Sequence, residues 1–338
     1  MLEVELDIFS GMPNPRWVLT EPEERDLIER LTAEPEQISP VATADEEFGL
    51  GYRGLIVRLI KPDDNSPWSK AQRSIGVSIP SEFRVGSRPA TRAPTAGWLL
   101  QTSEPANKNS RVTDELRAAA SSGVVLQSSS AGINPTTFQV PTPGDSGTES
   151  AYLPTVAGEG AHSPGQAPTA SLDAGPQPGA TWWDCGSNYF SANASSFNAP
   201  EHVARNNCYW FASNHLAGVR YALPGRRGGR PATSITCGGV TDGLYADGWR
   251  DGCQQDGLTI VMVIWPNYDY HFYRLVTDEP YWWWGHKPGA TPAKYTDDCG
   301  NSIYQYNGQG YAPNNCCRGS YSDFCGYFYP NNWTAFVA

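Results

Sequence analysis

The sequence predicts an α+β protein with two dissimilar folded units joined by an extended segment rich in Pro, Ser, Gly and Ala. Its 34 glycines and 28 prolines among 338 residues exclude a single long helical bundle. All eight cysteines lie between residues 185 and 325, whereas the first 184 residues contain none. Strands are predicted in the first unit by alternating apolar residues and in the second by a continuous apolar run, and apolar residues at helical spacing occur in both. This segregation predicts a small α+β unit over residues 1–122, a linker over 123–180 and a dense aromatic α+β domain over 181–338.

The charge of the chain narrows the class of partner. The 24 basic and 35 acidic residues give a net charge of −11, which argues against nucleic acid or an anionic membrane as the main partner. The longest apolar run covers residues 258–265 and is too short to span a bilayer, which needs about 20 residues in a helix. We therefore expect a peptide, a glycan or another protein as partner, and no membrane span.

Cysteine usage predicts the compartment. The start of the chain, Met1-Leu-Glu-Val-Glu-Leu-Asp7, is acidic and alternating, so it has no recognisable signal peptide. The cysteines form no C-x-x-C pair, and the five histidines are scattered, so neither a zinc site nor a cofactor is expected. Disulfides in an oxidising compartment explain the cysteines better, which predicts an extracellular or cell-surface protein.

The N-terminal unit begins with a strand and a helix. Apolar residues alternate from Leu2 to Ile8, and the turn Ser10-Gly-Met-Pro-Asn-Pro15 follows. Thr20 is a suitable N-cap for a helix with Pro22 in its first turn. This unit shows no catalytic motif, so docking or oligomerisation is its predicted role. Its remaining elements are expected as strands at Gly54–Ile60 and Gly97–Gln101 and a helix at Thr113–Ala120.

The segment over residues 123–180 lacks the apolar content of a folded core. Its composition is typical of a flexible tether, because such a chain cannot bury enough surface to offset its ordering entropy. The alternative is a segment ordered against a neighbouring domain or subunit. Apolar residues that could anchor it are Val124, Val125, Leu126, Phe138 and Val140.

The C-terminal region carries nine of the 12 tryptophans and a candidate nucleophile. Residues 206–218 read as a helix that begins at an asparagine cap and ends at glycine, with Cys208 in its first turn. A thiol at that position faces the positive end of the helix dipole, which lowers its pKa and favours the thiolate. The alternative reading of Cys208 is a half-cystine or a small buried apolar residue.

Two histidines lie where a base for that thiolate is expected. Residues 258–265 predict a buried strand, 266–269 a turn and 270–276 the returning strand, which carries His271. His286 lies on or just after the next strand. The spacing permits a catalytic constellation of Cys208, His271 and His286. Either histidine could equally be a structural hydrogen-bonding residue.

Four motifs occur in order along this region. They are Asn206-Asn-Cys-Tyr209, Asp269-Tyr-His-Phe-Tyr-Arg274, His286-Lys-Pro-Gly289 and Phe324-Cys-Gly-Tyr-Phe328. The ordered set is similar to that of a group of largely uncharacterised bacterial proteins, and the order of Cys and His resembles that of papain-like (NlpC-type) thiol hydrolases. The resemblance implies a papain-like α+β domain and carries over Cys208, His271 and His286.

Two functions follow from these patterns. The first is a secreted cysteine peptidase or amidase that cleaves peptide, peptidoglycan or protein amides. In it Cys208 is the nucleophile, His271 the general base and His286 the group that orients the imidazole. The second is a non-catalytic, disulfide-stapled extracellular structural or binding protein, such as a surface fibre, sheath or adhesive subunit. Its N-terminal unit or linker could form homo-oligomers. Four disulfides would leave no nucleophile, whereas a free Cys208 requires another cysteine to be unpaired or bonded between chains.

Overall fold

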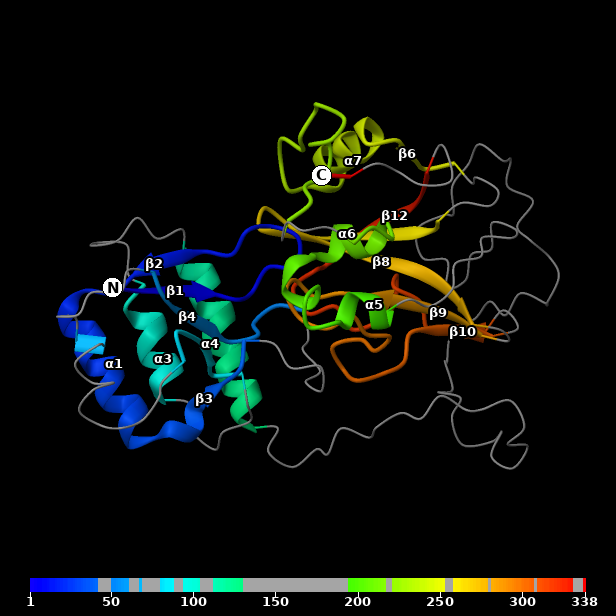
Figure 1. The fold of residues 1–338 in the computed structure, drawn as a ribbon. Coiled ribbons are helices and arrows are strands. Elements are labelled where there is room, and N and C mark those ends of the chain that lie inside the picture. The colour runs from blue at the N-terminus through cyan, green and yellow to red at the C-terminus, as the bar shows by residue number, and fades with distance from the viewer. Residues whose placement is uncertain are drawn as a thin grey trace, which may run out of the picture.

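Within its described residues the chain forms two antiparallel sheets, each covered by helices (Figure 1). A computed structural model describes residues 1–41, 50–60, 67–68, 80–87, 94–103, 112–129, 194–216, 221–252, 258–278, 281–306, 309–330 and 337–338. The described residues up to 129 are called the N-terminal half, and those from 194 onwards the C-terminal half. The mixed helix and sheet content confirms the predicted α+β class. In this described part of the chain no helix combines the length and apolar character that a bilayer span needs.

The N-terminal half is built on a five-stranded sheet with the order β2-β1-β4-β5-β3. The predicted strands at Leu2–Ile8 and Gly54–Ile60 are confirmed as β1 and β4, which pair with Leu2 opposite Leu59. The sheet is antiparallel throughout. Its strands are β1 (Leu2–Leu6), β2 (Arg16–Val18), β3 (Ile38–Ser39), β4 (Leu55–Leu59) and β5 (Glu82–Val85).

Three helices share a core with this sheet. Helix α1 (Glu21–Ala33) begins as predicted at Thr20, whose side chain forms a capping box with Glu23. Helix α3 (Pro94–Gln101) occupies the place of the strand predicted at Gly97–Gln101, so that prediction is wrong. A short run such as Trp-Leu-Leu fits either element, and here the run packs on the core through Ala96, Leu99 and Leu100.

Helix α4 (Asp114–Ser129) confirms the predicted helix at Thr113–Ala120 and extends it. It runs to Ser129, so the domain boundary predicted at residue 122 lies inside a helix. Its buried side chains Leu116 and Ala120 pack with the other helices of this half. Residues 130–193, which include most of the predicted linker, lie outside the described residues.

The C-terminal half contains a seven-stranded sheet with the order β11-β10-β9-β8-β7-β12-β6. The predicted hairpin is confirmed, because β7 and β8 pair with Trp265 opposite Asp269 and Val263 opposite His271. The strands are β6 (Trp249–Arg250), β7 (Ile260–Trp265), β8 (Asp269–Asp278), β9 (Tyr281–His286), β10 (Tyr304–Tyr306), β11 (Gln309–Gly310) and β12 (Asp323–Pro330).

Each face of this sheet has its own core. Alternate residues of β7 and β8, among them Met262 and Phe272, pack with the helices α6 (Cys208–Ala212) and α7 (Cys237–Ala246). The intervening residues, among them Val263 and Tyr273, form the core of the other face. Helix α5 (Ala194–Asn198) packs on α6 through the rings of Phe197 and Phe211. In Figure 1 α5 and α6 lie in front of strands β8 and β9.

Candidate functional site: the histidine pair and the junction of the two halves

The structure brings His271 and His286 together. His271 Nε2 lies 2.8 Å from His286 Nδ1, and both side chains are fully buried. They lie on neighbouring strands, because Tyr273 of β8 pairs with His286 of β9. The ring of His286 stacks on that of Tyr273, with their centroids 4.7 Å apart. The predicted proximity of the two histidines is therefore present.

The hydrogen bonds of this pair define its protonation. His286 Nε2 lies 2.7 Å from the carbonyl oxygen of Thr296, which can only accept, so this nitrogen donates. His286 Nδ1 then accepts from His271 Nε2, and the remaining nitrogen, His271 Nδ1, has no hydrogen. Burial lowers the pKa of both histidines well below the usual value, so both rings stay neutral. The two hydrogen bonds run in one direction, from His271 to His286 and from His286 to the carbonyl of Thr296, and link β8, β9 and the loop at Thr296.

Cys208 does not join this pair. Its Sγ lies 3.9 Å from the carbonyl oxygen of Tyr270, and its side chain is fully buried in the core that contains Tyr270 and Phe272. His271 stands between those two residues in the sequence, so its side chain points to the opposite face of β8. The sheet therefore separates the thiol from the imidazole. The constellation predicted for Cys208, His271 and His286 lacks the contact between nucleophile and base.

The expected low pKa of Cys208 is also wrong. Burial, followed by the nearby Asp269 carboxylate, raises the pKa of the Cys208 thiol well above its usual value. The predicted cap is confirmed, since the Asn207 side chain accepts from the backbone N–H of Trp210. However, α6 ends at Ala212 instead of continuing to Gly218, so it has one short turn and a weak dipole. Cys208 is a neutral, buried packing residue.

A densely hydrogen-bonded carboxylate, Asp269, was not predicted as a site from the sequence. Asp269 begins β8 and accepts from the backbone N–H groups of Ser10, Gly11 and Met12 at distances between 2.5 and 3.2 Å. The hydroxyl of Tyr321 donates to it at 2.5 Å. Burial nevertheless raises the pKa of Asp269 to about 6, with these hydrogen bonds opposing the rise. One buried side chain thus holds three consecutive residues that lie more than 250 positions away in the chain.

The turn that Asp269 holds is fixed on both sides. Within the N-terminal half, Asn14 Oδ1 accepts from the backbone of Ile8 and Phe9, and Arg53 donates to the carbonyl of Phe9. From the C-terminal half, the side chains of Asn207 and Tyr270 donate to the carbonyl of Gly11. Glycine is required at position 11, since a Cβ there would lie 2.2 Å from the Tyr270 ring.

Further contacts surround this turn. Leu50 donates its backbone N–H to Asp298 at 2.5 Å, and the ring of Phe9 meets that of Trp265 edge to face. The Tyr268 hydroxyl donates to Glu115 at 3.4 Å. We call this set of contacts between the halves the junction. It consists of Phe9, Ser10, Gly11, Met12, Leu50 and Glu115 from one half and Asn207, Trp265, Tyr268, Asp269, Tyr270 and Asp298 from the other.

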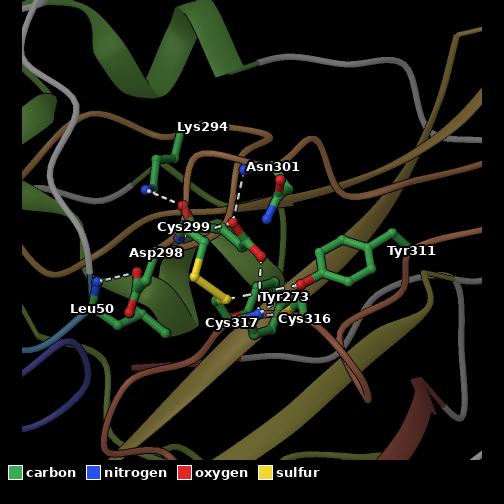
Figure 2. The surroundings of a disulfide bond; sticks show 10 residues. Leu50, Tyr273, Lys294, Asp298, Cys299, Asn301, Tyr311, Cys316 and Cys317 are labelled. Atoms are coloured by element: carbon green, nitrogen blue, oxygen red, sulfur yellow. Dashed lines mark hydrogen bonds between the residues drawn. A yellow bond between two sulfur atoms is a disulfide. The ribbon is translucent and has the colours of Figure 1, made fainter. Parts of the chain in front are cut away.

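Two disulfides lie in the C-terminal half, as the cysteine content predicts. Cys237 of α7 bonds Cys325 of β12, and Cys299 bonds Cys317 across an 18-residue separation. Figure 2 shows the second disulfide beside Tyr311 and the adjacent thiol Cys316. Cys208 and Cys316 are free and buried, which agrees with the expectation that a free Cys208 leaves a second cysteine unpaired. Cys185 and Cys253 lie outside the described residues.

One acidic residue lies close enough to this disulfide to be considered with it as a metal site. One oxygen of Asp297 and the sulfurs of Cys299 and Cys317 lie within 4.8 Å of one another. The two sulfurs are bonded to each other, so they are not thiolate ligands in this state. The Asp297 carboxylate instead accepts from the backbone N–H groups of Cys299, Asn301 and Cys317. Asp297 therefore stabilises, through these hydrogen bonds, the loop that the disulfide closes.

The comparisons with known proteins give one informative relative. The insoluble matrix shell protein 1 of Ruditapes philippinarum is 39% identical over 126 residues, which are 36% of this chain and 78% of that protein. No family model matches the chain, and no solved structure matches it.

This relative corrects the principal functional prediction. A cysteine hydrolase acting on peptide or cell-wall amides is contradicted, because the relative is a matrix protein of a shell. The descriptions of the chain as a hydrolase, as cysteine peptidase-like and as papain-like are therefore wrong as well. The physical reason is that Cys208 and His271 lie on opposite sides of the sheet, so the thiol has no contact with the imidazole. The similarity to uncharacterised bacterial proteins stays a prediction. At 39% identity over most of the relative's length, the chain belongs to the family of insoluble matrix shell protein 1.

Proposed function

We propose that this chain is a non-catalytic structural protein of an extracellular matrix, which works by assembling with copies of itself or with other matrix proteins. The observation that carries the proposal is the 39% identity to a protein named for an insoluble shell matrix, over 78% of that protein's length. A non-catalytic extracellular structural role was part of the second of the two functions that the sequence predicts.

The chemistry of the C-terminal half supports this role. Disulfides persist in oxidising compartments, so the Cys237–Cys325 and Cys299–Cys317 bonds favour an extracellular location. The histidine pair is buried and neutral, and the buried Cys208 thiol has a raised pKa. These groups hold strands and loops together, which is the task of a stable building block. Protein partners therefore take the place of peptide or peptidoglycan substrates.

Concentration-dependent assembly tests the proposal. The oxidised chain is purified as a monomer and brought from about 1 µM to about 1 mM, the range between a tight and a weak association. The sedimentable fraction is then measured by centrifugation and the particle mass by light scattering. We expect monomers to pass into large, sedimentable particles as the concentration rises. A chain that remains monomeric throughout, alone and with an extract of matrix proteins, would contradict self-assembly and protein partnership alike.

Fractionation of the source organism tests the location. Antibodies against the folded chain should detect it in the insoluble extracellular fraction. A cytosolic enzyme carried through the same extraction serves as the control for contamination. Recovery of the chain with that soluble enzyme would contradict a matrix role even if purified protein assembles.

A further inference from the structure

The junction joins parts of the chain that are remote in sequence. The Asp269 contacts to Ser10, Gly11 and Met12 span separations of 257 to 259 residues. The N-terminal side offers backbone N–H groups and the carbonyl of Gly11, while the C-terminal side offers a carboxylate, an amide and a phenol. None of these contacts depends on the two sides belonging to the same molecule.

Each side of the junction is held in place by its own half. Asn14 and Arg53 fix the turn that presents the N–H groups. On the other side, Asp269 belongs to the β7–β8 hairpin, and Tyr321 donates to its carboxylate. Two preformed, complementary surfaces lose little conformational freedom when they dock, which favours association.

The covalent connection between the halves is long. Helix α4 ends at Ser129 and α5 begins at Ala194, so 64 residues separate them. A connection of that length reaches at most about 210 Å at 3.3 Å per residue, several times the diameter of a small domain. The effective concentration of one half for the other falls as the connection lengthens. A neighbouring copy can therefore compete for the docking surface when the protein is concentrated.

We propose that the junction also forms between copies, with the N-terminal half of one chain docked on the C-terminal half of the next. This proposal rests on the proposed matrix function and names the surface through which the chain assembles. The two sides differ, so the contact is heterologous. Repeated contacts of this kind give open filaments unless their rotation closes a ring. Exchange of an intact half between copies requires no new interface.

Complementation between two variants tests this surface. Gly11→Val disables the N-terminal side, because any Cβ at position 11 collides with the Tyr270 ring. Asp269→Ala disables the C-terminal side, because it removes the acceptor for three N–H groups. Neither variant alone has two working sides, so we expect each to remain monomeric. A mixture refolded together contains one working pair and should give a 1:1 heterodimer in light scattering coupled to size exclusion.

The double variant Gly11→Val/Asp269→Ala is the matched control. Mixed with either single variant it supplies no complementary side, so no heterodimer should form. Circular dichroism and disulfide mapping verify that each chain folds. If Gly11→Val or Asp269→Ala misfolds, Gly11→Ala replaces the first, and Asp269→Leu, which has a similar shape and no acceptor, replaces the second. Folded variants that fail to form the heterodimer overturn this inference, while concentration-dependent sedimentation of the unmodified chain would still uphold the matrix function.

Discussion

The two halves of the molecule stabilise buried cations in different ways. In the N-terminal half, Asp7 lies 2.9 Å from Arg53 and 2.7 Å from Arg84, and all three side chains are fully buried. In the C-terminal half, Arg274 donates to the carbonyl of Phe211 and the amide oxygen of Asn214. In the N-terminal half the buried arginines form ion pairs with a carboxylate, whereas in the C-terminal half Arg274 donates hydrogen bonds to neutral oxygens.

The difference appears in the acidity of the two arginines. Burial alone lowers the pKa of Arg53, but the Asp7 carboxylate reverses this and the pKa is raised. Burial lowers the pKa of Arg274 to about 10, since no carboxylate offsets it to the same extent. The N-terminal half therefore depends on its ion pairs, while the C-terminal half has neutral acceptors, rings and disulfides to replace them.

Breaking the buried ion pairs should have the largest effect. Asp7→Ala leaves two buried guanidinium groups without their shared carboxylate, so we expect the free energy of unfolding to fall by about 5 kcal/mol. Urea denaturation followed by circular dichroism measures this. The control is Glu82→Gln, whose carboxylate is 45% exposed and pairs with Arg58, with an expected loss below about 1 kcal/mol. Equal losses in the two variants would contradict the importance of burial.

Removing the disulfides tests the other half of the comparison. The Cys237–Cys325 bond closes an 88-residue separation, so replacing both cysteines with serine should cost up to about 4.6 kcal/mol through loop entropy. The same change at Cys299 and Cys317, separated by 18 residues, should cost up to about 3.2 kcal/mol. Thermal and urea unfolding measure both. The reverse order would show that local strain outweighs loop length.

Buried titratable groups of the C-terminal half make its stability depend on pH. Burial raises the pKa of Asp269 from 3.8 to about 6, so between about pH 4 and 6 the folded state keeps a proton that the unfolded state releases. Acidification through this window is therefore stabilising. His271 and His286 have lowered pKa values, so the unfolded state alone binds their protons below about pH 6.5, and acidification is destabilising. Asp298, whose pKa burial also raises to about 6, acts in the same direction as Asp269.

Asp269→Asn removes one of the two stabilising protonations. Between pH 6 and 4 the unfolding free energy of this variant should decline on acidification more steeply than that of the unmodified chain, by about 1.4 kcal/mol per pH unit. Urea titrations at intervals of half a pH unit measure the two slopes. Parallel slopes would mean that Asp269 titrates alike in the folded and unfolded states.

The smallest expected effect is that of Cys208→Ala. The side chain is fully buried but contributes a single sulfur to the core, so its removal should cost about 1 kcal/mol. A thermal melt by calorimetry measures this. Cys316→Ala offers a second buried, free cysteine for comparison. A decrease of more than about 3 kcal/mol in the free energy of unfolding for Cys208→Ala would indicate that the thiol stabilises the fold by more than packing.

Local patterns predicted much of the fold. Short-range preferences of the backbone determine three elements that were predicted correctly: the alternating strand β1, the cap of α1 at Thr20 and the β7–β8 hairpin. Such preferences can be recognised from neighbouring residues in the sequence. Helix α3 was predicted as a strand because its short apolar run fits a strand as well as a helix. The length of α6 was overestimated because His215 and Leu216 continue the helical spacing after Ala212, where the helix ends.

The candidate site was harder to predict. Cys208 and His271 were paired because a cysteine at a helix start followed by a histidine on a strand matches the order of residues in papain-like thiol hydrolases. The face of the sheet that the histidine occupies depends on the register of β8, and a shift of one position changes that face. Asp269 was read as part of a turn, since its partners lie more than 250 residues away. The sequence feature that could have indicated this contact is the glycine of the Ser10-Gly-Met turn, because glycine often marks a close approach of another chain segment.

The location of the Cys237–Cys325 bond has a mechanical consequence for a protein built into a matrix. When a chain is pulled from its ends, residues enclosed by a disulfide carry no tension and cannot extend. The enclosed segment would otherwise lengthen by about 300 Å at 3.3 to 3.6 Å per residue. Extension is therefore confined to residues outside this segment, among them the cysteine-free N-terminal half, where Asp7 and its arginines resist it without a covalent bond. Under load, the segment between the two cysteines keeps its end-to-end distance as long as the disulfide is intact.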